Sequence, residues 1–256
     1  MLEEIKNLTL EAGTHLLKAG RTNYQIFNKE GRGEYVTQWD IKIQNMLEEG
    51  LKEICPEAGL LGEEGGAAGP ELESGWCFIV DPIDGTNNFI RSYCHSAISV
   101  ALSHKGEVLY GAVCDPYLGE LFYAEKGKGA FCNGKEIRAG DRKLKESVVI
   151  FGTSNYDRSF TNPTFTLLRA LFDQADDLRN GGSAVLDLCY IACGRGDIFF
   201  EYQLCPWDYA AGGLILSEAG GVMETMEGKA PPLCGKSPII AATPRLLEEI
   251  RSMGII

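Results

Sequence analysis

Two aspartates in the first half of the chain are placed to bind a divalent cation. Asp81 and Asp84 lie three residues apart, directly after the apolar run 78–80, and a proline between them restricts the backbone, so both carboxylates can project from one tight turn. Carboxylates this close repel each other unless a hard cation lies between them, and oxygen ligands are those that Mg²⁺ selects. The backbone N–H groups of Gly85 and Thr86, at a predicted helix start, would offer a site for an anion. The alternative is an Asp-Pro turn followed by a capped helix.

Two further acidic segments lie elsewhere in the chain. Glu63 and Glu64 follow an apolar pair and precede a glycine-rich stretch, and Asp208 lies in the first turn of a predicted helix whose small residues permit close packing. Each has a simpler interpretation. The glutamates can form a solvated acidic turn, and Asp208 can compensate the helix dipole. A single metal site requires the fold to bring all three segments together.

Composition excludes several classes of protein. The chain has 256 residues, which is enough to bury a substantial core, and it carries 36 acidic against 24 basic residues for a net charge of −12. Such a surface repels a phosphate backbone, so nucleic acid is not an expected partner. No apolar run approaches the roughly 20 residues that a bilayer crossing needs, and the acidic start is unlike a secretory signal. Neither a membrane protein nor an exported one is expected.

Cysteine and histidine are not arranged for zinc or for a disulfide framework. Nine cysteines occur without a CxxC pair, and the three histidines form no HxxxH pair. Cys189 and Cys193, four residues apart on an apolar stretch, are interpreted as reduced core residues. Reduced thiols indicate the cytoplasm.

The elements that must position the acidic residues follow from the spacing of apolar side chains. Residues 2–19 predict a helix, and a second is expected to run from Asp40, as its cap, to Ile54. Residues 28–34 and 62–69 are interpreted as loops. Further helices are expected at 165–172, 184–193, 207–219 and 245–253, and strands at 76–80, 97–102, 108–114, 120–124, 130–132, 148–151, 197–202, 222–225 and 239–242.

These elements indicate an α/β (α+β) fold of two sheet-and-helix lobes in one layered unit. Residues 103–107 read as a hairpin connection, so the first sheet is expected to be largely antiparallel. The polar run 139–146 is the best internal boundary, which gives an N-terminal α+β lobe at 1–145 and a C-terminal α/β lobe at 146–256. Residues 127–130 (Gly-Lys-Gly-Ala) lack the third glycine and the following helix of a nucleotide loop, so they are interpreted as a turn between strands.

Taken together, the acidic segments resemble the signature segments of the inositol monophosphatase family. The matching segments, which occur in the family order and cover nearly the whole chain, are Val36–Asp40, Gly62–Glu64, Asp81–Thr86, Gly127–Gly134, Trp207–Ala211 and Glu218–Gly221. The resemblance implies the layered αβαβα sandwich of that family, with the metal-binding loops in the N-terminal lobe and Asp208 in the C-terminal one.

The resemblance also implies a set of metal ligands for two or three Mg²⁺ ions. Glu63, Asp81 and the carbonyl group of Ile83 correspond to ligands of the first ion. Asp81, Asp84 and Asp208 correspond to ligands of the second, and Glu63 also corresponds to a ligand of a weaker third ion.

The remaining site residues are likewise implied by the resemblance. Asp40 and Thr86 correspond to the pair that helps activate the attacking water, with Glu63 helping to orient it, and the backbone at Gly85 and Thr86 would hold the phosphate. Lys29 falls in the mobile loop that closes the site. The positions that face the alcohol are Gly182, Ser183, Ala184, Glu201 and Asp208.

The implied activity is Mg²⁺-dependent hydrolysis of a small phosphomonoester, most simply a myo-inositol monophosphate, by metal-activated water. The absence of a paired Ser–His or Cys–His motif agrees with a mechanism that needs no covalent nucleophile. The alternatives are a fructose-1,6-bisphosphatase, a histidinol-phosphate phosphatase, a nucleotide 3′-phosphatase or a degenerate metal-binding regulatory protein. Asn87 and Asn88 stand where the nucleotide 3′-phosphatase branch carries Lys-Glu, which favours the inositol type. A homodimer and sensitivity to lithium are further expectations from the family.

Overall fold

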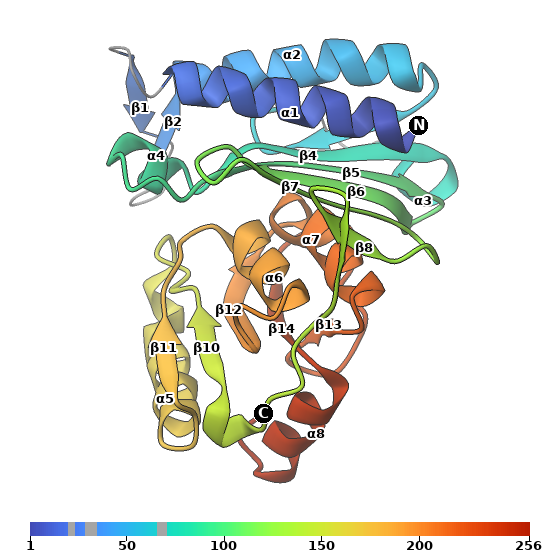
Figure 1. The fold of residues 1–256 in the computed structure, drawn as a ribbon. Coiled ribbons are helices and arrows are strands. Elements are labelled where there is room, and N and C mark those ends of the chain that lie inside the picture. Colours follow the sequence, from blue (N-terminus) through green and yellow to red (C-terminus); the bar gives the residue numbers. More distant parts are fainter. Residues whose placement is uncertain (20–23, 29–34, 66–70) are drawn as a thin grey trace.

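The chain folds into five layers in the order helices, sheet, helices, sheet, helices (Figure 1). The structure is a computed structural model, and it describes residues 1–19, 24–28, 35–65 and 71–256. Helices α1 (Leu2–Ala19) and α2 (Gln38–Ile54) cover the outer face of the first sheet. The middle layer is formed by α6 (Ala184–Ala192) and α7 (Pro206–Glu218), and the last by α5 (Thr161–Phe172) and α8 (Pro244–Ser252). This is the αβαβα sandwich expected from the sequence.

The first sheet is antiparallel except at one edge. Its strands lie in the order β3-β4-β5-β6-β7-β8-β9, and only β3 pairs parallel, with β4. The predicted hairpin at 103–107 joins β5 and β6, as expected, whereas the sequence did not predict β3 or β9. The strands are β3 (Gly59–Gly62), β4 (Trp76–Asp84), β5 (Ala97–His104), β6 (Glu107–Asp115), β7 (Glu120–Glu125), β8 (Ala130–Cys132) and β9 (Lys135–Ile137).

The second sheet is mixed, with the order β11-β10-β12-β14-β13. Strand β10 pairs parallel with both of its neighbours, and β14 pairs antiparallel with β12 and β13. All strands of the first sheet precede the predicted boundary at residue 145, and all strands of the second sheet follow it. The division into two lobes stays a prediction, because α7 contacts strands of both sheets. The strands are β10 (Val148–Phe151), β11 (Asp177–Arg179), β12 (Ile198–Leu204), β13 (Val222–Thr225) and β14 (Ser237–Ala242).

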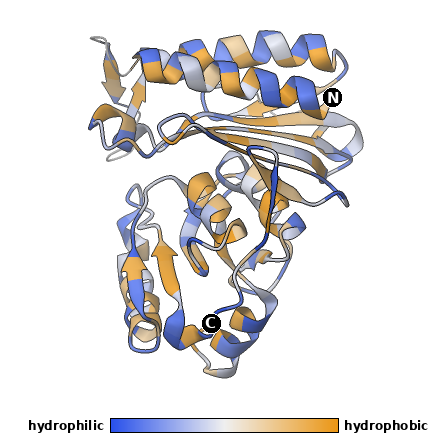
Figure 2. Cartoon of the chain, viewed as in Figure 1, coloured by the Kyte–Doolittle hydropathy of each residue, from blue (hydrophilic) through white to orange (hydrophobic). Residues whose placement is uncertain are grey.

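Apolar side chains of the described residues form three cores: one under α1 and α2, one around the middle helices, and one under α5 and α8. Figure 2 shows that hydrophobic residues are frequent in the strands. The middle core holds α6 and α7 between the two sheets, so these helices are buried on two sides. Cys189 is fully buried there as a free thiol and Cys193 is partly buried, as the sequence indicated.

The glycine-rich turn at 127–130 connects β7 and β8, and it is anchored by an acidic residue of this chain. The backbone N–H groups of Gly127 and Gly129 each donate a 2.8 Å hydrogen bond to the carboxylate of Glu218, at the end of α7. The turn therefore fixes α7 against the first sheet, and the interpretation as a turn between strands is confirmed.

Short elements complete the described chain. Strands β1 (Ile26–Asn28) and β2 (Tyr35–Thr37) pair antiparallel, so residue 28 belongs to a strand and not to the predicted loop. Lys29 and the rest of that loop lie outside the described residues. The other short helices are α3 (Glu71–Ser74) and α4 (Thr86–Ile90) and two 3₁₀ turns, Leu144–Glu146 and Arg158–Phe160. Among the described residues, no helix is long and apolar enough to span a bilayer.

Candidate active site

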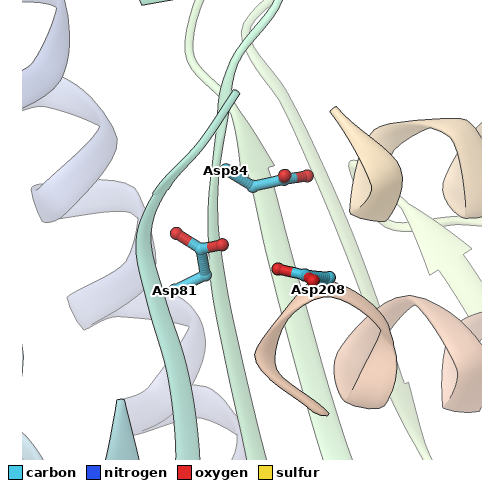
Figure 3. Close-up of side chains that lie close together, drawn as sticks. All are labelled: Asp81, Asp84 and Asp208. Carbon is cyan, nitrogen blue, oxygen red and sulfur yellow. The ribbon is translucent and has the colours of Figure 1, made fainter. Parts of the chain in front are cut away.

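Three aspartates from two distant segments lie close together, and two of them are buried and the third is partly buried. Asp81 and Asp84 lie on β4 and Asp208 lies in the first turn of α7, and one carboxylate oxygen from each falls within 4.8 Å of the others (Figure 3). The sequence predicted a turn at 81–84, but β4 continues to Asp84. An irregularity in its pairing with β5 between Asp81 and Asp84 lets both side chains reach the same place.

One carboxylate oxygen of each of these aspartates accepts hydrogen bonds from the protein itself. Asp81 Oδ1 accepts a 3.0 Å hydrogen bond from the N–H of Ile83, and Asp208 Oδ2 accepts one of 2.7 Å from the N–H of Cys205. Asp84 Oδ2 accepts from Ser183 Oγ and from the N–H of Val185, at 2.6 and 2.8 Å. The second oxygen of each carboxylate accepts no hydrogen bond from the described residues, so it remains available to a ligand.

The cluster is electrostatically strained because its charges are alike and shielded from water. Burial, followed by the charges of Glu63 and Asp84, raises the pKa of Asp81 well above its usual range, and burial with the charge of Asp84 does the same to the pKa of Asp208. The pKa of Asp84 rises to about 6, chiefly through burial. None of the ion pairs between described residues involves these three aspartates. A cation in their midst would remove the strain.

Glu63 joins the cluster from the neighbouring strand. Strand β3 ends at Gly62, and the N–H of Glu63 donates to the carbonyl oxygen of Val80 on β4 at 3.3 Å. Glu63 therefore lines, with the three aspartates and Ile83, a cavity of about 190 Å³ that we call cavity 1. The parallel strand β3, which the apolar pair 60–61 by itself did not reveal, is what delivers this glutamate.

Asp40 and Thr86 form a hydrogen-bonded pair beside cavity 1. The hydroxyl group of Thr86 lies 3.0 Å from Asp40 Oδ1 and 3.0 Å from the carbonyl oxygen of Ile83. Asp40 Oδ2 accepts from the N–H and hydroxyl of Thr37, at 2.7 and 2.5 Å. Burial raises the pKa of this carboxyl, and its hydrogen bonds oppose the shift.

The prediction that Asp40 caps α2 is wrong. Thr37 is the cap, and Asp40 is the third residue of the helix, where its carboxylate completes a capping box with Thr37. Helix α2 therefore begins at residue 38. The capping box uses Asp40 Oδ2, so Oδ1 is the oxygen that remains to accept a hydrogen bond from Thr86.

Helix α4 begins at Thr86, as expected, and the turn before it requires glycine. Gly85 has a φ of +88°, and a Cβ atom there would lie 3.0 Å from the carbonyl oxygen of Gly182. The turn at 85–86 therefore packs directly on the segment 181–183. Two parts of the candidate site that are about a hundred residues apart in sequence are in contact here.

A second cavity, of about 420 Å³, adjoins the first and shares Asp84, Thr86 and Asp208 with it. Of the residues expected to face the alcohol, Gly182, Ala184, Glu201 and Asp208 line this cavity 2. Ser183 is fully buried and lines neither cavity, because its hydroxyl group is bonded to Asp84.

Glu201 lies in the middle of β12. Its Oε1 accepts hydrogen bonds from the N–H and hydroxyl of Ser154, at 2.8 and 3.4 Å, and a Cβ atom on Gly152 would collide with its Oε2. Burial raises the pKa of Glu201 to about 7. The carboxyl group is thus held firmly at the wall of cavity 2.

Sequence reasoning missed several polar residues that line these cavities, among them Asn88, Gln203 and Tyr156. Asn88 lines cavity 2, whereas Gln203 and Tyr156 line both. Asn88 lies within the segment that carries Asp81 and Asp84, and Gln203 is two residues beyond Glu201, the period that keeps side chains on one face of a strand. Tyr156 lies in the irregular segment after β10, where no periodicity points to it.

Comparison with known proteins agrees with this geometry. Residues 1–253 match the inositol monophosphatase family, and the chain belongs to that family. The inositol-1-monophosphatase of Rhizobium meliloti is 40% identical to this chain, over 88% of this chain and 87% of that protein. The Nus factor SuhB of Xylella fastidiosa is 38% identical, over 82% of this chain and 76% of that protein. The crystal structure of the extragenic suppressor protein suhB from Bartonella henselae superposes with a TM-score of 0.90 at 32% identity, over 98% of this chain and 96% of that one.

Proposed function

We propose that this protein hydrolyses a small phosphomonoester to an alcohol and inorganic phosphate, with a polyol phosphate such as myo-inositol monophosphate as substrate and Mg²⁺ as cofactor. The observation that carries the proposal is the meeting of Asp81, Asp84 and Asp208 around one point, each with an oxygen left for a ligand. A sequence match to the R. meliloti inositol-1-monophosphatase supports it.

The donor set fits Mg²⁺. Carboxylate oxygens are the ligands this ion prefers, and clustered buried carboxylates are stable in their charged form only with a cation among them. Asp81, Asp84, Asp208, Glu63 and the carbonyl group of Ile83 would hold two or three ions. When bound, the ions would neutralise the charge of the phosphate and lower the pKa of a bound water.

The pair of Thr86 and Asp40 orients the attacking water. A threonine hydroxyl has one hydrogen to donate, and Asp40 Oδ1 accepts it at 3.0 Å. The lone pairs of Thr86 Oγ1 are then left to accept a hydrogen from water at the edge of cavity 1. Because Thr37 fixes the other oxygen of Asp40, the water is held in one direction, and Glu63 provides a second acceptor.

The two cavities divide the substrate between them. The phosphate lies in cavity 1 against the backbone of Gly85 and Thr86, and the alcohol lies in cavity 2. The wall of cavity 2 carries amide and carboxyl groups, among them Glu201, which suit an alcohol rich in hydroxyl groups. A larger apolar alcohol would leave these groups without partners.

The alternatives are the related phosphatases and a role without catalysis. The relative from X. fastidiosa carries the name Nus factor, which keeps a regulatory role open as the second candidate. Intact Glu63, Asp81, Asp84 and Asp208 favour catalysis, because clustered like charges destabilise a fold that has no use for them. A homodimer in the cytoplasm with no nucleic-acid partner stays a prediction.

A phosphate-release assay over a panel of esters tests the proposal. The panel contains inositol 1-phosphate, fructose 1,6-bisphosphate, histidinol phosphate and a nucleoside 3′-phosphate, each with Mg²⁺ and with EDTA. We expect Mg²⁺-dependent release that is fastest with inositol 1-phosphate. Faster turnover of another ester would assign that substrate instead, and no release from any ester would favour the regulatory role.

A further inference from the structure

The amide group of Asn88 is held in one orientation by two backbone carbonyl groups. Its Nδ2 donates hydrogen bonds to the carbonyl oxygens of His95, at 2.7 Å, and of Gly181, at 2.9 Å. Both hydrogens of the NH₂ group are therefore used. A flipped amide would set its oxygen against two carbonyl oxygens, so the orientation is determined by the hydrogen bonds themselves.

The carbonyl oxygen of the same side chain is left without a donor. Asn88 Oδ1 accepts no hydrogen bond from the described residues, and the side chain lines cavity 2. Gly182, on the same wall, has a φ of +78°, and a Cβ atom there would lie 3.2 Å from Nδ2 and 3.4 Å from Oδ1 of Asn88. The absence of a side chain at Gly182 thus keeps the amide accessible.

The position of Asn88 is also fixed relative to Asp84, one of the three clustered aspartates. Asp84 accepts hydrogen bonds from Ser183 and Val185, and Asn88 donates one to Gly181. The segments 84–88 and 181–185 are therefore hydrogen-bonded to each other at both ends. An acceptor carried on such a doubly held segment cannot move away from the candidate site. Preorganisation of this kind is what a specificity group needs.

We propose that Asn88 Oδ1 accepts a hydrogen bond from a hydroxyl group of the alcohol part of the substrate, which makes Asn88 a specificity-determining residue. The proposal rests on the function proposed above and narrows the substrate to phosphomonoesters of alcohols that carry at least one further hydroxyl group. It assigns Asn88 no part in binding the phosphate, because Asn88 does not line cavity 1.

Two esters of equal ring size test the inference. myo-Inositol 1-phosphate and cyclohexyl phosphate share a six-membered ring, and only the first has free hydroxyl groups. The measured quantity is the ratio of their kcat/KM values, which partial misfolding leaves unchanged because it lowers both values together. We expect the wild type to prefer the inositol ester at least tenfold, and Asn88→Ala and Asn88→Ser to reduce that ratio by about tenfold, as the loss of one hydrogen bond predicts.

The control is Asn133→Ala. Asn133 also bonds the backbone at both ends of its amide, to Leu121 and Gly119, but it lines neither cavity. This variant should keep the wild-type ratio. An unchanged ratio in both Asn88 variants, or a wild type without preference for the inositol ester, would overturn the inference while leaving hydrolysis intact. Failure of the wild type to release phosphate from these two esters and from every ester of the panel above would instead refute the proposed function.

Discussion

The hydroxyl group of Ser183 donates a 2.6 Å hydrogen bond to the carboxylate of Asp84, a residue 99 positions earlier in the chain. The N–H of Val185 donates to the same oxygen. Ser183 precedes α6 but makes no cap of its own, so Asp84 of β4 caps a helix of the middle layer. The candidate metal ligand is therefore oriented by a segment from the other half of the chain.

Divalent metal should stabilise the fold as well as support activity. Because Mg²⁺ at about a hundred times its Kd adds roughly 2.7 kcal/mol to the free energy of unfolding, the Tm should rise by about 5 °C or more. Asp81→Asn should lose this rise and, in EDTA, unfold at a higher temperature than the wild type, since an amide removes the repulsion. Asp141→Asn changes an exposed carboxylate and should behave as the wild type. Equal melting curves with Mg²⁺ and with EDTA would argue against the metal site.

Thr86→Ala should lower kcat by about 10²-fold, because it removes the hydroxyl group that we propose links the attacking water to Asp40. Thr86→Ser keeps that hydroxyl group and should keep most of the activity. Thr14→Ala, which deletes a hydroxyl group on the exposed side of α1, serves as the control. A kcat for Thr86→Ala within a few-fold of the wild type would remove Thr86 from the mechanism.

Glu63→Gln should also cost about 10²-fold in kcat, since it preserves the shape of the side chain and removes a charge close to Asp81 in the proposed metal site. The fold should survive, because neutralising Glu63 relieves the repulsion that raises the pKa of Asp81. Glu53→Gln alters an exposed carboxylate of α2 and should have no effect. Steady-state kinetics at saturating Mg²⁺ would decide, and an unchanged kcat would exclude Glu63 as a participant.

Without metal, the protein should become more stable as the pH falls from about 7 to 5. The pKa values of Asp84, Asp187 and Glu201 are raised by burial, to about 6, 6 and 7. The folded state therefore binds more protons than the unfolded state over this range, and the free energy of unfolding decreases as the pH rises.

Mg²⁺ should reverse this pH dependence, because it binds only the charged carboxylates. The rise in Tm that Mg²⁺ causes should thus disappear as the pH falls below about 6. Thermal unfolding from pH 5 to 8, with Mg²⁺ and with EDTA, measures both effects. A metal-free Tm that increases with pH over this range would contradict the assignment.

Glu201→Ala should lower kcat/KM for inositol 1-phosphate by about 10- to 100-fold, the range for losing a hydrogen bond to a charged group. p-Nitrophenyl phosphate has no hydroxyl group to offer, so its kcat/KM should change far less. Glu201→Gln, which can still accept from Ser154, separates the loss of charge from the loss of the wall of cavity 2. Equal losses with both esters would place Glu201 in the scaffold.

The sequence predicted most of the regular elements and the fold, because apolar periodicity is strong in elements such as α1 and β5. It missed short strands such as β3 and β9. It also ended the strand 76–80 before Asp81, because a proline inside 81–84 reads as a break, whereas the pairing irregularity in β4 accommodates it. It also placed the N-cap of α2 at Asp40 instead of Thr37. An aspartate near a helix start can be either the N-cap itself or the third helical residue, whose carboxylate pairs with the N-cap in a capping box.

The sequence predicted the acidic residues of the candidate site but not the hydrogen bonds that orient them. The three carboxylate segments carry their own motifs, so their residue types point to a metal. The hydrogen bonds that orient them, such as those from Ser183 and Val185 to Asp84, join residues about a hundred positions apart, and no local pattern encodes such a pair. The same holds for Asn88, whose partner Gly181 lies 93 positions away.

The separation of Asp208 from Asp81 and Asp84 has a consequence for biosynthesis. The chain leaves the ribosome from its N-terminus, so β4 can pair with β5 long before α7 has been translated. During that interval the two aspartates of β4 lack the third carboxylate, so the site proposed for the second ion is incomplete. We therefore expect a divalent ion at the site proposed for the second ion to stabilise only chains in which the middle layer has already assembled.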